Sequence, residues 1–380
     1  MLLGLYGDAE LHRIDKMLLV RFGKPHRVIS TCRVFGGLHD DLKGMFNHQL
    51  CEPSGHMRTE LKTIVTKPEA YLHKLCDLYG LPERTASLGT AANMHYAAVE
   101  TASFRDLSVT AVCTGGVEGN AGRVGDPASV WEEDDGFEPL LHTGTEPCGT
   151  INTMLLINRE LTPGAMVRSV VTATEAKSAV LQELAVSSRY SQGLATGTGT
   201  DQIAVACSLS GSRPLTSAGK HSKLGELIGQ AVLQAIRKTL SLQNSLTPQH
   251  QRSIYEHIRR FGVGREEMTE AIAGRLPEEI AALFRRNVSS LDRDPVAVGA
   301  VCALVHLRDK LEWGILPDSC ARELFVMQGA LLAVAASKRE GGYERFATQL
   351  AGEHVAPEPK DFVAFVTTCC ALGYREKWKN

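Results

Sequence analysis

The 380-residue chain has almost no net charge, because 41 Lys and Arg residues face 43 Asp and Glu residues. This balance removes the electrostatic basis for binding nucleic acid or an anionic membrane. No uninterrupted apolar run approaches the roughly 20 residues that span a bilayer. The N-terminus also lacks the basic region that precedes the apolar stretch of a signal peptide. We therefore expect a cytoplasmic protein with a small-molecule partner, no nucleic-acid partner and no membrane contact.

The cysteine spacing typical of a zinc site is also missing. The ten cysteines are scattered, with no C-x-x-C pair, whereas zinc ligands normally occur in such pairs. The sequence therefore predicts reduced, mostly buried thiols and no protein-bound metal.

Several common catalytic motifs are absent. The chain has no G-x-S-x-G and no H-E-x-x-H, which argues against a nucleophile-elbow hydrolase and a zincin protease. Gly219-Lys220 is followed by His221 rather than Ser or Thr, so it is not a phosphate-binding P-loop.

The pattern of expected secondary structure changes at the polar segment 241–248, which ends in a helix-stopping proline. Short β-type runs alternate with helical patterns before it, and helix follows helix after it. We expect an α/β domain over residues 1–243 and an all-helical domain over residues 248–380. The expected strands are 27–31, 107–112, 151–157 and 202–207; the expected helices are 163–184, 223–240, 249–260, 266–274, 277–286, 295–310, 320–335 and 361–372.

Glycine, threonine and asparagine concentrate in three segments at strand ends: 114–126, 149–153 and 196–201. Glycine lets a backbone approach a ligand closely. A loose surface connection explains one such loop equally well, but three similar strand ends favour a single site. A threonine hydroxyl is a nucleophile when a base takes its proton, and an asparagine amide can donate to the resulting oxyanion. For any single threonine, a local structural role is the ordinary alternative.

The stretch from Val28 to Arg237 resembles the adenosylcobinamide amidohydrolases of corrinoid salvage. The matching motifs are Ile29-Ser30-Thr31, Gly36-Gly37, Asn47-His48-Gln49, Thr110-Ala111-Val112, Asn120-Ala121, Gly125-Asp126-Pro127, Gly149-Thr150-Ile151-Asn152-Thr153, Thr172-Ala173-Thr174-Glu175-Ala176-Lys177, Gly197-Thr198-Gly199-Thr200-Asp201 and His221-Ser222-Lys223-Leu224-Gly225-Glu226. The resemblance implies hydrolysis of the amide that joins aminopropanol to the corrin ring of adenosylcobinamide, releasing adenosylcobyric acid. The corrinoid would be substrate and would carry its own cobalt, so no separate cofactor is expected.

A fainter resemblance, to β-aminopeptidases and ornithine acetyltransferases, implies an α/β/β/α sandwich. In those enzymes a Ser or Thr heading a strand becomes the nucleophile after self-cleavage of the preceding bond. Carried over, Thr150 is the nucleophile and Asn120 the oxyanion donor. Thr198, Thr200 and Asp201 form the supporting polar group. An intact, fully active chain would exclude the self-processing version.

Cys148 adjoins Gly149 and is a second choice of nucleophile, because a thiol is intrinsically more nucleophilic than a hydroxyl. The acidic segment 131–148 is longer than the resemblance implies, and it is either a lid or a solvated loop. The substrate-binding candidates are Asn47, His48, Gly115, Gly116, Asn152, Glu175, Lys177 and His221.

Two other functions stay open from the sequence: a non-catalytic corrinoid-binding or sensing protein, and an aminopeptidase or acyltransferase of the same fold. The sequence leaves the oligomeric state open, a homo-oligomer included. The helical domain lies outside the resemblance and could serve assembly, cover the substrate or dock another enzyme.

Overall fold

The computed structural model describes residues 2–6, 9–51, 64, 66–133, 136–140, 149–209, 211 and 213–377. The chain divides into two compact units, Met1–Leu246 and Thr247–Asn380.

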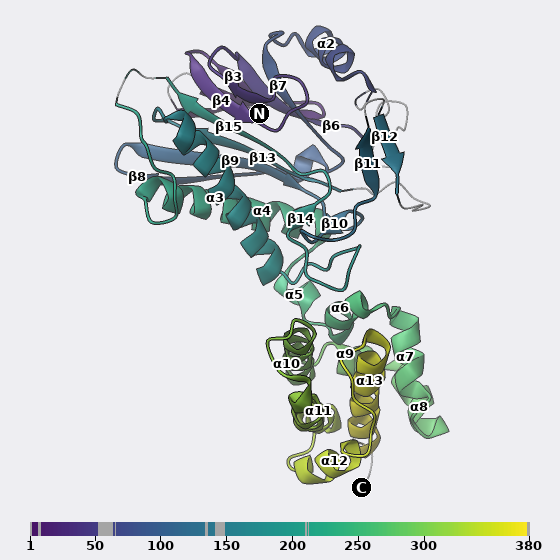
Figure 1. The fold of residues 1–380 in the computed structure, drawn as a ribbon. Helices are drawn as coiled ribbons and strands as arrows, with labels where there is room; N and C mark the ends of the chain where they lie inside the picture. Colours follow the sequence, from purple (N-terminus) through teal and green to yellow (C-terminus); the bar gives the residue numbers. More distant parts are fainter. Residues whose placement is uncertain are drawn as a thin grey trace. The chain divides into compact units, whose positions relative to one another are not determined.

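Two large sheets form the body of the first unit (Figure 1). One sheet has the strand order β1-β2-β3-β6-β7 and the other has the order β5-β4-β15-β13-β9-β8. Within these sheets, β6 and β7 pair in parallel, as do β13 and β15, and the other pairings are antiparallel. The strands are β1 (Leu2–Tyr6), β2 (Ala9–Ile14), β3 (Met17–Phe22), β6 (Gly44–Gln49), β7 (Thr85–Thr90), β5 (Gly37–His39), β4 (His26–Ser30), β15 (Gln202–Ser208), β13 (Ile151–Ile157), β9 (Leu107–Gly115) and β8 (Ala98–Phe104).

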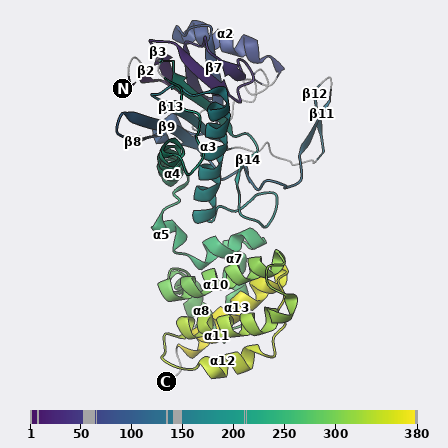
Figure 2. The same cartoon turned by 60° about the vertical axis from the view of Figure 1, so that its left-hand side comes forward.

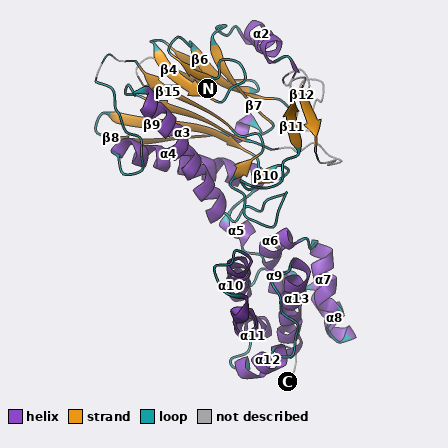
Figure 3. Ribbon diagram, viewed as in Figure 1, coloured by secondary structure: helices purple, strands orange, loops and turns teal. Residues whose placement is uncertain are grey.

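Three separate cores show that this unit has four layers. One core lies between the two sheets and includes Val20 of β3 and Leu156 of β13. A second packs the six-stranded sheet against helices α3 (Pro163–Glu183) and α4 (Lys223–Asn244). A third packs the five-stranded sheet against α2 (Pro68–Tyr79). The helices cover the outer faces of the paired sheets (Figures 1 and 3), which confirms the expected α/β/β/α arrangement.

The long helices begin and end where their sequences allow. Thr162 caps the start of α3 by accepting a hydrogen bond from the Ala165 N–H, and proline follows at the first helical position. Ser222 caps α4 in the same way, through the Gly225 N–H. The latter helix runs to Asn244, so the first half of the polar segment 241–248 is helical. It ends at Ser245, which adopts the left-handed conformation with φ 54°.

Short elements complete the first unit. They are η1 (Met94–Tyr96), the β10 (Ala121–Gly122) and β14 (Gly197–Thr198) pair, and the hairpin of β11 (Val130–Glu133) and β12 (Gly136–Pro139). The hairpin's described positions on β11 are all exposed. Figure 2 shows it standing out from the body of its unit.

The second unit is helical over its described residues (Figure 3). Its core gathers the apolar faces of all its long helices. The expected helical character is confirmed, and α9 and α12 are additions that the pattern did not predict. The helices are α5 (Pro248–Gln251), α6 (Ile254–Ile258), η2 (Arg259–Phe261), α7 (Arg265–Ala273), α8 (Glu278–Arg286), α9 (Ser289–Asp292), α10 (Pro295–Glu312), η3 (Asp318–Cys320), α11 (Ala321–Ser337), α12 (Tyr343–Leu350) and α13 (Pro359–Glu376).

One helical stretch among the described residues, Asp318–Ser337, is long and apolar enough to cross a membrane by length and composition alone. The same stretch supplies Phe325, Leu332 and Ala333 to the core of the helical unit, where each is fully buried. Core helices of water-soluble proteins share this composition, so the stretch is weak evidence for a membrane.

Candidate active site

The three polar segments meet because of the strand pairing. Ile151 pairs with Gly115 of β9, and Asn152 pairs with Gln202 of β15. The end of β9 therefore lies beside the beginnings of β13 and β15. The short β10–β14 pairing joins Ala121 to Thr198, which brings the loop containing Asn120 to the same place.

Thr150 lies at the head of β13 and is 3 % exposed. Its hydroxyl donates to the Thr200 carbonyl over 2.6 Å and lies 2.7 Å from the Thr200 hydroxyl. In the intact chain the Thr150 hydroxyl is therefore covered and fully engaged.

The Gly149 carbonyl, immediately before Thr150, accepts two side-chain hydrogen bonds. Asn120 Nδ2 donates to it over 2.9 Å, and Thr200 Oγ1 donates over 3.1 Å. Asn120 Nδ2 also lies 3.2 Å from Thr200 Oγ1. Two donors aimed at one carbonyl oxygen are what stabilises an oxyanion in acyl transfer.

Glycine is required before Thr150. Gly149 has φ +137°, and a β-carbon there would lie 2.6 Å from the Gly116 carbonyl oxygen. Any other residue would be both strained and obstructed.

Tyr190 orients Asn120, and sequence reasoning missed it. The Tyr190 hydroxyl donates to Asn120 Oδ1 over 2.7 Å, which turns Nδ2 toward the Gly149 carbonyl. Tyr190 lies in the loop that follows α3 and belongs to none of the polar motifs. Its tyrosine pKa is raised, chiefly by burial, so the phenol stays protonated as a donor near neutral pH.

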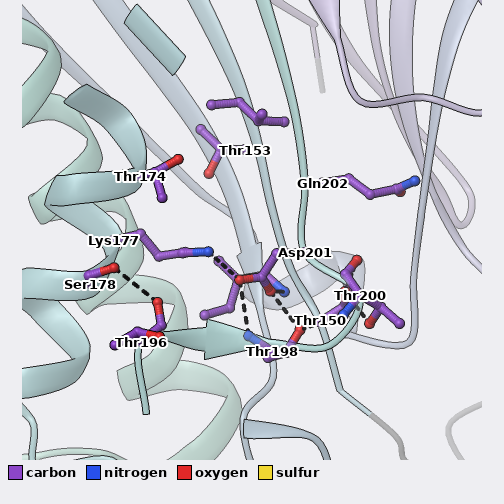
Figure 4. Close-up of polar contacts among 12 residues, drawn as sticks. Thr150, Thr153, Thr174, Lys177, Ser178, Thr196, Thr198, Thr200, Asp201 and Gln202 are labelled. Atoms are coloured by element: carbon purple, nitrogen blue, oxygen red, sulfur yellow. Dashed lines mark hydrogen bonds and ion pairs between the residues drawn. The ribbon is translucent and has the colours of Figure 1, made fainter. Parts of the chain in front are cut away.

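Asp201 connects the strand ends (Figure 4). Its carboxylate accepts from the Ile151 N–H over 2.8 Å and from the Thr198 hydroxyl over 2.6 Å. Lys177 of α3 forms an ion pair with the same carboxylate, and both side chains are mostly buried. Asp201 therefore holds β13, β14 and α3 in fixed relation around Thr150.

A cavity of about 710 Å³ lies beside this group. Thr150 and Asp201 do not line it, whereas their partners Asn120, Lys177 and Thr200 do. The full lining is Asn120, Gly122, Arg123, Val124, Asp126, Pro127, Ala128, Ser129, Val130, Thr174, Lys177, Ser178, Tyr190, Thr196, Gly197, Thr198, Gly199 and Thr200.

Asn47 and Asn152, expected to contact substrate, lie instead between the two sheets, 1 % and 0 % exposed. Asn152 Nδ2 donates to Asn47 Oδ1 over 3.0 Å, and Asn47 Nδ2 donates to the Thr114 hydroxyl over 2.8 Å. The two amides join β6 to β9 and β13 behind the site.

His48 faces the opposite side of β6 from Asn47. Its Nδ1 lies 2.6 Å from the Tyr71 hydroxyl of α2, and the histidine is 6 % exposed. The structure does not bring it to the cavity.

The remaining substrate-binding candidates, Lys177 apart, also lie away from the cavity lining. The Gly115 N–H donates to the Thr239 hydroxyl of α4, and the Gly116 N–H donates to the Thr150 carbonyl, so neither amide is available to a ligand. Glu175 pairs with Lys220 at the surface. His221 is exposed just before α4.

Among the described residues, no cysteine lines the cavity. Cys148 lies outside them. Burial raises the pKa of the Cys113 thiol to about 12, which leaves it unreactive. Where the chain is described, no group of three or more His, Cys, Asp or Glu side chains could hold a metal ion.

Comparison with known proteins identifies the class. Residues 2–248 match the family described as adenosylcobinamide amidohydrolase, CbiZ. An uncharacterized protein of Methanocaldococcus jannaschii is 32 % identical over 237 residues, covering 61 % of this chain and 88 % of that protein. An adenosylcobinamide amidohydrolase of Methanosarcina mazei is 32 % identical over 126 residues, covering 29 % of this chain and 60 % of the relative.

The class is that of hydrolases that cut an amide of a corrinoid. The chain belongs to the CbiZ family of adenosylcobinamide amidohydrolases, which act in corrinoid salvage. The resemblance seen in the sequence motifs is thereby confirmed.

Proposed function

We propose that Thr150 is the nucleophile with which this chain hydrolyses the amide joining aminopropanol to the corrin ring of adenosylcobinamide. The observation that carries the proposal is the pair of donors, Asn120 and Thr200, on the carbonyl next to the Thr150 hydroxyl. The substrate amide carbonyl takes the position that the Gly149 carbonyl occupies in the intact chain.

The reaction has two steps. The Thr150 oxygen attacks the amide carbon, and the oxyanion accepts hydrogen bonds from Asn120 and Thr200. The C–N bond breaks, the nitrogen takes a proton and aminopropanol leaves. Water then hydrolyses the ester on Thr150, releasing adenosylcobyric acid and restoring the hydroxyl.

Self-cleavage at Gly149–Thr150 prepares this site. The chain's own carbonyl fills the donor pair, and the nucleophile is 3 % exposed, so substrate cannot enter until residue 149 moves. Attack of the Thr150 hydroxyl on the Gly149 carbonyl carbon breaks the peptide bond and forms an ester. Hydrolysis of that ester leaves a Gly149 carboxylate and a free Thr150 amine, which then serves as the base for the hydroxyl.

The test is chromatography of adenosylcobinamide incubated with purified protein, combined with intact-mass analysis of the chain. We expect adenosylcobyric acid and two fragments meeting at Gly149–Thr150. Thr150→Ala should give neither product nor cleavage. Thr153→Ala, on the opposite face of the same strand, should retain both.

The two parts of the proposal fail differently. An intact chain whose activity still depends on Thr150 removes self-cleavage and keeps the nucleophile. Full activity of Thr150→Ala removes Thr150 from the chemistry. Corrinoid retained without turnover by the wild type favours the binding-protein alternative.

A cytoplasmic location is part of the proposal. The nine cysteines in the described part of the chain are all free, as is usual in a reducing compartment.

A further inference from the structure

The cavity beside the proposed nucleophile has a lining of two kinds. Lys177 and Ser178 of α3 give it polar surface, together with Thr198 of β14 and Thr196 just before that strand. A single segment, 123–130, supplies its aliphatic side chains and its proline, which are Val124, Pro127, Ala128 and Val130. We call these four residues the apolar ledge.

The ledge is unusually exposed for apolar side chains. Val124 is 83 % exposed and Val130 is 48 % exposed. Single exposed valines need no explanation, but a cluster at the rim of a cavity marks a binding surface.

The ledge is also held in place. Asp126 Oδ2 accepts from the Arg123 N–H over 2.7 Å and from the Ser188 hydroxyl over 2.6 Å. The Val124 N–H donates to the Thr196 hydroxyl over 2.9 Å. These bonds position Val124 before any ligand arrives, which lowers the entropy cost of binding there.

We propose that the apolar ledge binds the ring face of the corrinoid, while the amide arm extends toward Asn120 and Thr200. This inference rests on the proposed function. A cavity of about 710 Å³ is of the size that encloses a drug-sized ligand, and a corrin bearing an adenosyl group is larger. Part of the ligand must then lie on the rim, where the ledge offers apolar contact and the polar lining faces the amides.

The experiment uses adenosylcobyric acid, which keeps the ring but lacks the scissile amide and so cannot be turned over. The double variant Trp313→Phe, Trp378→Phe leaves Trp131, next to Val130, as the single tryptophan. Because corrins absorb where tryptophan emits, binding on the ledge should quench its fluorescence. In this background, Val124→Thr with Val130→Thr should raise Kd about tenfold, as expected when apolar contacts are exchanged for hydroxyls.

The matched control is Val167→Thr, a 54 % exposed valine on α3 that does not line the cavity. It should leave Kd unchanged. Unfolding midpoints of all variants should agree, since threonine is close to valine in size and the exposed sites are tolerant.

The outcomes separate the two proposals. Ledge-dependent binding without hydrolysis of adenosylcobinamide by the wild type supports the ledge and overturns the proposed chemistry. If the wild type hydrolyses adenosylcobinamide but the ledge substitutions leave Kd unchanged, the binding role of the ledge is contradicted and the proposed chemistry stands. Equal Kd values in the ledge and control variants contradict the inference in either case.

Discussion

At the scale of single residues, the site depends on the orientation of the Asn120 side-chain amide. Asn120 can serve an oxyanion only if Nδ2, not Oδ1, points at the carbonyl, and the Tyr190 hydroxyl fixes that choice. Tyr190→Phe should therefore lower kcat about tenfold with little change in KM, because the lost orientation matters most in the transition state. Deleting a donor itself, as in Asn120→Ala, should cost about 100- to 1,000-fold. Steady-state kinetics on adenosylcobinamide measures both.

Tyr96→Phe is the control for this prediction. Tyr96 is 39 % exposed and does not line the cavity, so its kinetics should match the wild type. A Tyr190→Phe enzyme with unchanged kcat would show that Asn120 holds its orientation without the phenol.

The sequence predicted which polar residues gather, but not which way each points. Thr150, Asn120, Thr198, Thr200 and Asp201 lie together for two reasons. The ends of β9, β13 and β15 adjoin in one sheet, and the separate β10–β14 pairing brings the segments of Asn120 and Thr198 to them. Their catalytic roles stay predictions. Tyr190 was missed because an ordinary loop tyrosine carries no local signal, and its value comes from a contact 70 residues away in sequence.

At the scale of elements, the end of α4 packs closely on the end of β9. A β-carbon on Gly115 would lie 2.9 Å from a methyl of Leu240 and 3.1 Å from Thr239 Cγ2. Gly115→Ala should therefore destabilise the fold by about 1–3 kcal/mol, as overpacking does. Denaturant unfolding monitored by circular dichroism measures this.

Gly229→Ala, within α4, should have the opposite effect on the stability of the fold. Nothing lies within 4 Å of a β-carbon built there, so alanine should stabilise the helix by about 0.5–1 kcal/mol. A destabilised Gly229→Ala, or a neutral Gly115→Ala, would contradict the packing described for α4.

The stability that Asp126 contributes through its hydrogen bonds beside the apolar ledge should decrease at low pH. Partial burial alone would raise the pKa of Asp126, but hydrogen bonds from the Ser188 and Ser191 hydroxyls and the Arg123 N–H lower it. A carboxylate with a lowered folded-state pKa adds stability above its unfolded pKa of about 3.9 and loses it as the pH falls through the folded value. The difference in unfolding free energy between wild type and Asp126→Asn should therefore be largest near pH 7 and shrink below about pH 4. A difference that does not vary between pH 7 and pH 3 would contradict this assignment.

The five-stranded sheet was not predicted, and its burial explains why. Its central strand β3 has Met17, Leu18, Leu19 and Val20 buried in succession, because α2 covers one face and the other sheet covers the opposite face. Such a run lacks the alternation that marks a half-buried strand. The neighbouring strand β6, which carries Asn47 and His48, is buried along its whole length as well. Without a strand assigned there, Asn47 and His48 were expected to share a site, although successive strand residues point to opposite faces.

At the scale of the whole chain, the two units have separate cores. The core of the helical unit draws on residues from Ile254 onward, and the three cores of the first unit end at Leu246. The periodicity of apolar residues predicted most helices of the second unit, because this periodicity is visible within each short stretch of sequence. It gave no function for them, since helices that only pack on one another carry no chemical motif.

The match to known proteins suggests that the first unit works alone. The family match ends at residue 248, and the alignment with the Methanocaldococcus protein spans 88 % of that relative, which leaves it little length for a helical unit. Residues 1–246 expressed alone should therefore fold and hydrolyse adenosylcobinamide with a kcat/KM close to that of the full chain. Circular dichroism establishes folding, and the chromatographic assay gives the rate. A folded but inactive fragment would assign the helical unit a part in catalysis, while equal activity with a changed oligomeric state would assign it to assembly.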